Sequence, residues 1–437
     1  MTAEIAILNK SAVALAADSA VTMSRSARTK IYNTDKLFML SGFFPVGIMV
    51  YNEAEFLGIP WETLIKTFRT ELDGTPFGNV KAYADRFIDF LSTNKMFTEN
   101  LQADHYASTV LHRFNQMLIE AKSLTHLRRD AGQKVKLKNI IEEVIKDRLT
   151  KWRSKDDLPG MGPEFGKEVA DKYKDSIQDA IKAIFEPYKL GEEALSQLNE
   201  IASYFPYKCA VIDGAYSGVV VAGFGENEVW PSLFEIIVDG VTLDKLKFYS
   251  GRNNIISNSS ASGITPFAQS DVVVSFIEGA DPAYGYFTDT YIVELLNKYH
   301  QRLNVTPEEA EKVINDLREG LKSYRLEKHV NPILSAVEAL PKDELATFAE
   351  SLVYLTSMKR RYSFDYETVG GPIDVAVISK GDGFVWIKRK HYFKPEMNPQ
   401  FFSNKYGSSF PNRRGGKHHG NKANDINNEK GGEFEST

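Results

Sequence analysis

Two kinds of hydrophobic pattern alternate along the chain. Residues 1–50 show the period of two that is typical of strands, first in AEIAIL and AVALAA, then in KLFMLSG and the apolar run that ends at Tyr51. A helix is predicted in EFLGIPWETLIKTFRTEL. From about Asp73 to Tyr204 apolar residues recur at three- and four-residue spacing, as in NIIEEVIKDRLTKW, which is the pattern of amphipathic helices.

Strand patterns return after this helical block. They occur in CAVIDG, SGVVVAGFG and SLFEIIVDGV, and GGPIDVAVISKGDGFVWIKRK predicts a β-hairpin around residues 381–383. Between them, helices are predicted from Thr265 through ELLNKYHQRL, in TPEEAEKVINDLREGL and over residues 341–360. In the second of these, Thr306 is the expected N-cap and Glu308 and Glu309 favour the helix start. This order predicts a layered α+β architecture rather than a doubly wound parallel sheet.

Composition narrows the choice of compartment and partner. The 437 residues carry a formal net charge of −5, so the chain has no overall basic character and nucleic acid is an unlikely partner. Cys209 is the single cysteine, which excludes an intrachain disulfide framework and favours a reducing compartment. No apolar stretch has the length of a membrane span, and the first residues lack the pattern of a signal peptide. We therefore expect a cytoplasmic protein with no membrane partner.

The opening MTAEIAILNKSAVALAADSAVT contains a candidate nucleophile. A small residue at position two normally permits removal of Met1, which would leave Thr2 with a free α-amine and a hydroxyl on one residue. An α-amine has a pKa of about 8 and can act as a base for its own hydroxyl. The nucleophile hypothesis therefore rests on removal of Met1.

The first predicted hairpin brings a carboxylate to Thr2. If residues 9–11 form the turn, antiparallel pairing places Thr2 opposite Asp18; a two-residue turn shifts the partner to Ala17. Lys30, held charged by Asp18, would lower the proton affinity of the amine and the hydroxyl. Gly42, which follows the strand in MLSGFF, is a candidate backbone donor for an oxyanion.

These residues carry a resemblance to a known family. TAEIAILNKSAVALAADSAVT followed by KIYNTDKLFMLSG resembles the β-subunits of the proteasome and their bacterial relatives, the N-terminal nucleophile (Ntn) hydrolases. The resemblance implies a four-layer αββα sandwich that needs no metal or organic cofactor. It also implies that Thr2 is the nucleophile, Asp18 the supporting acid, Lys30 the cation that sets the pKa, and Gly42 the oxyanion donor.

A second, weaker match lies in ETVGGPIDVAVISKGDGFVWI. It resembles a late strand pair of the same family, but Val369 stands where the family has serine, and Tyr366 where it has aspartate. A further family element, a Ser-Gly pair, corresponds to Ser262 and Gly263 when a gap is allowed, which makes Ser262 a candidate site residue.

The resemblance also divides the chain. A domain over residues 1–393 is expected to draw its core from 1–72, 206–300 and 365–393, with helical insertions at 73–205 and 301–364. The tail, residues 394–437, is rich in Asn, Gly and Lys and is expected to be disordered.

The function implied is that of a threonine-type peptidase. Thr2 would attack the carbonyl of an amide bond in a peptide or protein, and water would release the acyl-enzyme. Such relatives form homo-oligomers, and an unfoldase partner is possible. Two alternatives stay open: a non-catalytic scaffold or binding protein, and an amidase of small molecules.

Overall fold

The computed structural model describes residues 2–25, 28–209, 216–303, 306–363, 369–391 and 393–400. The chain divides into two compact units, Met1–Lys390 and His391–Thr437. In the second unit the described residues include a short 3-10 helix, Pro395–Met397. Most of the expected disordered tail, and most of the expected strand CAVIDG, lie outside the described residues.

The first unit is built on two five-stranded sheets. The strand order of the first sheet is β12 (Ser262–Ala268), β1 (Ala3–Asn9), β2 (Val13–Ala17), β13 (Asp374–Ser379) and β14 (Gly383–Lys388). The order of the second is β11 (Lys245–Ile255), β10 (Ser232–Thr242), β9 (Ser217–Gly223), β6 (Val46–Asn52) and β5 (Leu37–Met39). Neighbouring strands are antiparallel in both sheets.

Two small hairpins accompany the sheets. One pairs β3 (Ala20–Arg25) with β4 (Arg28–Asn33), and the other pairs β7 (Glu55–Phe56) with β8 (Ile59–Pro60). The first of them occupies the stretch of chain between β2 and β5.

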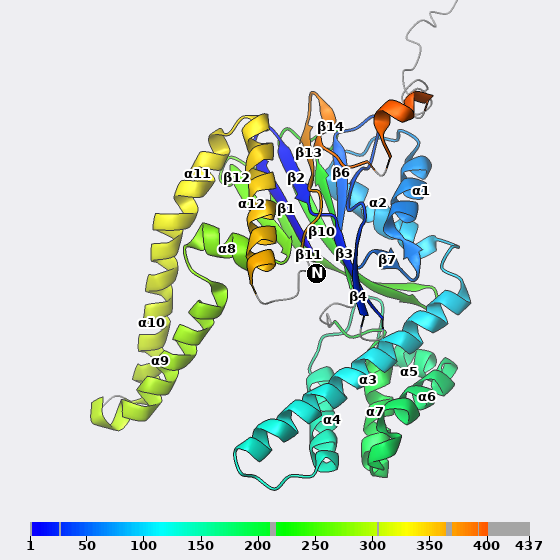
Figure 1. The fold of residues 1–437 in the computed structure, drawn as a ribbon, viewed down its shortest axis with the longest axis vertical. Helices are drawn as coiled ribbons and strands as arrows, with labels where there is room; N and C mark the ends of the chain where they lie inside the picture. Colours follow the sequence, from blue (N-terminus) through cyan, green and yellow to red (C-terminus); the bar gives the residue numbers. More distant parts are fainter. Residues whose placement is uncertain are drawn as a thin grey trace, which may run out of the picture. The chain divides into compact units, whose positions relative to one another are not determined.

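The two sheets pack face to face, and each is covered by helices on its outer face. Side chains such as Leu15 of the first sheet and Val220 of the second form the buried layer between the sheets. Helices α1 (Trp61–Leu72) and α2 (Val80–Thr93) cover the second sheet, while α8 (Asp271–Glu278), α11 (Asn331–Ala339) and α12 (Lys342–Tyr362) cover the first (Figure 1). The structure therefore confirms the four-layer αββα sandwich.

Some of the helices in the two predicted helical insertions cover the sheets, and the others pack among themselves. Helices α3 (Glu99–Asp130), α4 (Leu137–Arg153), α5 (Pro163–Lys172), α6 (Lys174–Phe185) and α7 (Glu192–Tyr204) share a hydrophobic cluster of their own. Helix α2 belongs instead to the sandwich, as do α11 and α12. Helices α9 (Pro282–Leu303) and α10 (Pro307–Arg325) pack on each other. No described helix has the length and apolarity needed to cross a bilayer.

The first hairpin has a different register from the one expected. Leu8 pairs with Val13 and Glu4 with Ala17, so paired numbers add up to 21 rather than 20. The cause is Asn9, whose side-chain oxygen accepts hydrogen bonds from the backbone N–H groups of the second and third residues after it. This local bonding closes a turn over residues 10 and 11 and keeps Asn9 in the strand.

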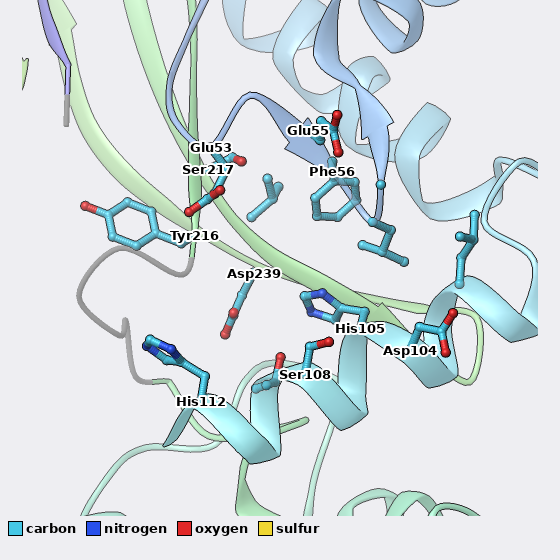
Figure 2. Close-up of a pocket in the computed structure, with 15 residues that line it drawn as sticks. Glu53, Glu55, Phe56, Asp104, His105, Ser108, His112, Tyr216, Ser217 and Asp239 are labelled. Atoms are coloured by element: carbon cyan, nitrogen blue, oxygen red, sulfur yellow. The ribbon is translucent and has the colours of Figure 1, made fainter. Parts of the chain in front are cut away.

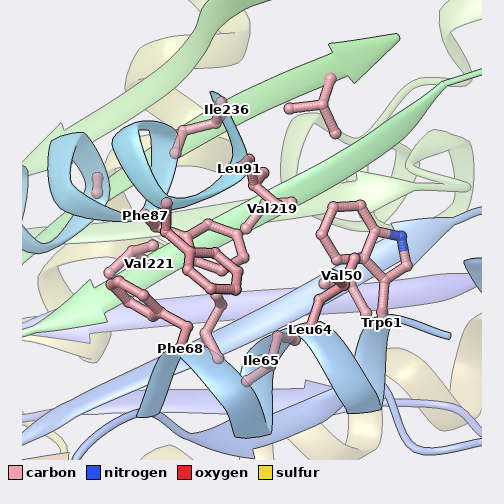
Figure 3. Packing of buried hydrophobic residues seen from close by; sticks show 14 of the residues in the cluster. Val50, Trp61, Leu64, Ile65, Phe68, Phe87, Leu91, Val219, Val221 and Ile236 are labelled. Carbon is pink, nitrogen blue, oxygen red and sulfur yellow. The ribbon is translucent and has the colours of Figure 1, made fainter. Parts of the chain in front are cut away.

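The layer between the second sheet and its helices is aromatic. Every three or four residues α1 presents an apolar side chain, and Trp61, Leu64, Ile65 and Phe68 meet Phe87 of α2 above strands β6, β9 and β10 (Figure 3). The rings of Phe68 and Phe87 are 4.9 Å apart in an edge-to-face arrangement.

This packing predicts the cost of a cavity. Phe87→Ala removes a ring with 0% exposure and is expected to lower the free energy of unfolding by about 3–5 kcal/mol. Phe43→Ala, at a side chain that is 67% exposed, is the matched control and should change it by less than about 0.5 kcal/mol. Urea unfolding followed by tryptophan fluorescence measures both, and equal losses would contradict this account of the core.

Candidate functional site

Thr2 lies at the start of β1 and faces the gap between the two sheets. Along β1, Ala3, Ile5 and Ile7 point to the helices of the outer layer, whereas Ala6 and Leu8 point inward. Since side chains alternate along a strand, Thr2 and Glu4 share the inward face. Thr2 is 1% exposed, and its hydroxyl makes no hydrogen bond to the described residues.

Asp18, which follows β2, connects the segments that surround Thr2. Its carboxylate accepts hydrogen bonds from the backbone N–H groups of Ala3 (3.1 Å), Ala20 (3.3 Å) and Gly370 (2.9 Å). It also accepts one from a lysine side chain. Asp18 thereby joins the start of β1, the start of β3 and the loop before β13.

The lysine in the site is Lys36, not Lys30. The Nζ of Lys36 lies 2.5 Å from Asp18 and 3.4 Å from the Glu4 carboxylate, and its side chain is 4% exposed. Lys30 falls within β4, where its backbone pairs with Met23. Because the β3–β4 hairpin takes up the chain between β2 and β5, the lysine that directly precedes β5 is the one that reaches Asp18.

Glu4 is a second buried carboxyl group beside the same lysine. Burial raises its pKa to about 8, an effect that Lys36 opposes and Asp18 reinforces. Neither carboxylate oxygen makes a well-formed hydrogen bond within the described part of the chain. At neutral pH the site therefore holds one ion pair, Lys36 with Asp18, and one neutral carboxyl group, Glu4.

Gly42 does not lie with these residues. It is exposed in the turn between β5 and β6, where a side chain at this position would meet open space. The N–H of Val50 donates to the carbonyl of Lys36, so the far end of β6, near Asn52, lies level with the lysine. The structure thus places Gly42 at the opposite end of β5 from the site, and the expected oxyanion role for it is corrected.

Ser262 is also remote from Thr2. It pairs with Asn9 at the other end of β1, and its hydroxyl donates to the carbonyl of Leu334. Val369 is buried against the outer helices, while its neighbour Gly370 supplies the N–H that reaches Asp18. Tyr366 lies outside the described residues.

A cavity of about 580 Å³ opens between the end of β6 and helix α3. Glu53 and Ser217 line one side, and α3 presents Asp104, His105 and His112 from the other (Figure 2). Partial burial raises the pKa of Glu53, and the neighbouring Glu55 raises it further.

A buried charge cluster joins α3 to the second sheet beside this cavity. Asp239 of β10 lies 2.6 Å from Lys247 and 3.5 Å from Arg113 of α3. The Arg113 guanidinium lies over the rings of Trp152 (4.8 Å) and Phe205 (4.4 Å). Burial lowers the pKa of Arg113 to about 10. These contacts hold the middle of α3 against β10.

Two histidines of α3, His105 and His112, lie on this cavity wall. Burial lowers the pKa of His105, which favours the neutral imidazole. No group of three or more metal-ligating side chains occurs in the described ranges.

Sequence reasoning missed Lys36 and Glu4, although each left a signal. Lys36 directly precedes the apolar residues LFM, so it stands at the start of a predicted strand. Glu4 is a lone charge in the strand AEIAIL, on the face that also carries Ala6 and Leu8. A carboxyl group at such a position is either exposed or functional.

Comparisons with known proteins match the chain to solved structures alone. No family model matches the chain, and no curated protein matches it. Among solved structures, an Anbu (Gly-1) mutant from Hyphomicrobium sp. strain MC1 is similar with 10% identity and a TM-score of 0.28, covering 94% of each chain. A helical assembly of the Anbu complex from Pseudomonas aeruginosa has 8% identity and a TM-score of 0.26, covering 94% of this chain and 100% of that one.

These findings correct the family assignment suggested by the sequence. The short motifs around Thr2 resemble proteasome β-subunits, but no family model matches the chain, and the solved structures named above are of Anbu. The sandwich and the site described above rest on the chain's own strand order and contacts.

The raised pKa of Glu4 predicts how stability depends on pH. An acid whose folded-state pKa is raised from 4.5 to about 8 contributes stability below pH 4.5 that is lost as the pH rises toward 8. Glu4→Gln imitates the protonated acid and should remove this loss. The variant should therefore gain a few kcal/mol over the native protein between pH 5 and pH 8.5, since one pKa unit corresponds to about 1.4 kcal/mol.

Urea unfolding at the two pH values measures the difference. Glu71→Gln, at an exposed glutamate of α1, is the control and should show the same pH dependence as the native protein. A native-minus-variant difference that does not change with pH would show that Glu4 does not titrate in this range.

Proposed function

We propose that the protein is an N-terminal threonine hydrolase that cleaves amide bonds through an acyl-enzyme on Thr2. The observation that carries the proposal is the unpartnered, inward-facing hydroxyl of Thr2 beside the buried Lys36–Asp18 ion pair. Removal of Met1 is a required step, because it frees the α-amine that accepts the hydroxyl proton.

Three residues have roles in this chemistry: Thr2, Lys36 and Asp18. Thr2 attacks the carbonyl carbon, and the proton passes to its amine. Lys36 stabilises the developing negative charge on the threonine oxygen by its nearby positive charge. Asp18 keeps Lys36 charged and, through the N–H of Ala3, fixes the start of β1. Collapse of the tetrahedral intermediate expels the amine of the substrate, and water then hydrolyses the ester.

Peptides or proteins are the proposed substrates. The cavity beyond Glu53, with a volume of about 580 Å³, is in the range that accepts a ligand larger than a small amide. The cytoplasmic location favoured by the single cysteine remains part of this proposal.

We also propose that the protein self-associates through α9 and α10. Large apolar side chains on these helices are exposed: Tyr284, Tyr286, Phe287, Tyr291, Val313, Leu317, Leu321 and Tyr324. Helix α10 has Glu308 and Glu309 in its first turn and Lys322 in its last turn. Antiparallel pairing of α10 with the same helix of a second copy about a two-fold axis would place the acidic end of each helix beside the basic end of the other.

The nucleophile assignment predicts a clear chemical modification. With a β-lactone probe, the native N-terminal peptide should lack Met1 and carry the adduct on Thr2, as measured by mass spectrometry. Thr2→Ala keeps a small second residue, and so keeps Met1 removal, but lacks the hydroxyl. It should lose labelling and turnover by at least about a thousandfold.

Thr2→Ser provides the matched control, because it retains both the hydroxyl and the amine and should still be labelled. Retention of Met1 in the native protein, or equal labelling of Thr2→Ala, would remove the nucleophile proposal and favour the scaffold alternative.

The substrate class is tested separately. We expect fluorogenic peptide amides to be hydrolysed with a higher kcat/KM than small aryl amides, because a peptide can also occupy the cavity beyond Glu53. Thr2→Ala measures the background for both. Faster hydrolysis of the small amides would favour the amidase alternative.

A further inference from the structure

The Glu4 carboxyl group has no function in the mechanism above. It is 2% exposed, faces the gap between the sheets and makes no well-formed hydrogen bond to the described residues. A buried polar group without a partner is costly, and such groups in native proteins are often found where chemistry is done.

The geometry points to Glu4 as a second general base for Thr2, acting directly on its hydroxyl. This inference rests on the proposed function and adds a catalytic residue to it.

The first support is the placement of the two groups. Thr2 and Glu4 are two residues apart on the same face of β1, and both side chains are buried. The hydroxyl of Thr2 and the carboxylate of Glu4 both lack a hydrogen-bond partner among the described residues. The hydroxyl also lies close enough to the carboxyl group to lower its pKa. Each is thus the available partner of the other.

The second support is the asymmetry between the two carboxylates beside Lys36. Asp18 accepts three backbone N–H groups as well as the lysine, at 2.5 Å from Nζ. Glu4 has only the lysine, at 3.4 Å. Glu4, which has the fewer partners, is the carboxyl group whose pKa is raised by burial.

In the part of the chain that the structure describes, two charged side chains act on Glu4. Lys36 reaches it from the start of β5, and Asp18 from the end of β2. On β12 its pairing partner is Phe267, which is apolar. The protonation of Glu4 therefore responds to this one ion pair and to burial, which together place its pKa at about 8, within the working range of a general base.

The proposed step balances. In this step the ionised Glu4 carboxylate, in place of the α-amine, accepts the proton of the Thr2 hydroxyl while the threonine oxygen bonds to the carbonyl carbon and the carbonyl π electrons move to its oxygen. When the intermediate collapses, the C–N bond breaks and the leaving nitrogen takes the proton from Glu4. The products are the free amine, the acyl ester on Thr2 and the Glu4 carboxylate.

The test compares Glu4→Gln with the native protein across pH. The measured quantity is the rate at which a β-lactone acylates Thr2, from pH 6 to pH 9.5. At pH 6 native Glu4 is protonated and glutamine resembles it, so the rates should agree within about threefold. At pH 9 the native carboxylate is available, and the variant should be slower by about 100-fold, the lower end of general-base contributions.

Other outcomes would overturn the inference and remain distinct from a failure of the proposed function. Equal rates at all pH values would show that the α-amine is the sufficient base, with Thr2 still the nucleophile. A loss of the same size at pH 6 and pH 9 would assign Glu4 a purely structural role. Absence of acylation in the native protein would remove the proposed function and this inference together.

A second variant covers the case in which Glu4→Gln does not fold. Glu4→Asp retains a carboxylate but withdraws it by one methylene group. It should keep the rise in rate with pH at a reduced rate, whereas a native rate or a rate independent of pH would contradict the inference.

Discussion

The structure around Thr2 depends on one buried ion pair, that of Lys36 with Asp18. Asp18 receives N–H groups from the adjacent start of β3, from the start of β1 and from the loop before β13, so segments far apart in the sequence converge on a single carboxylate. Lys36, which leads into β5, connects this point to the second sheet. A buried ion pair of this kind contributes little net stability, but leaving either member unpaired is costly. Its effect is to fix the relative positions of the two sheets at the site.

Much of the fold could be predicted from the sequence, because its signals are local. The alternation in β1 and β2, the apolar run of β6 and the hairpin of β13 and β14 each follow from a period of two. The helical block between the strands follows from a period near four. What the pattern could not show is which helices cover a sheet: α2 and α12 complete the sandwich, whereas α3–α7 build a core of their own.

The site was predicted only in part, and each miss has a physical cause. Asp18 lies beside the start of β1, where its carboxylate accepts the N–H of Ala3, although the hairpin register differs by one residue from the predicted one. Lys36 replaces Lys30 because an intervening hairpin takes up the chain between them. Gly42 and Ser262 were chosen by spacing, but strand direction carries both to the far ends of their strands. Glu4 was overlooked because its importance comes from burial between two sheets, which a single strand does not reveal.

The turn at Asn9 determines which side chains of β1 face the site. Its side chain fixes the register of the first hairpin, and a slip of one residue would exchange the two faces of β1. Glu4 would then point into the apolar layer beneath α12, and Ile5 into the gap beside Lys36. A polar side chain at the opposite end of the strand thus determines which groups face the reaction. Substitutions at this distant turn are therefore expected to inactivate the site while every residue within it remains unchanged.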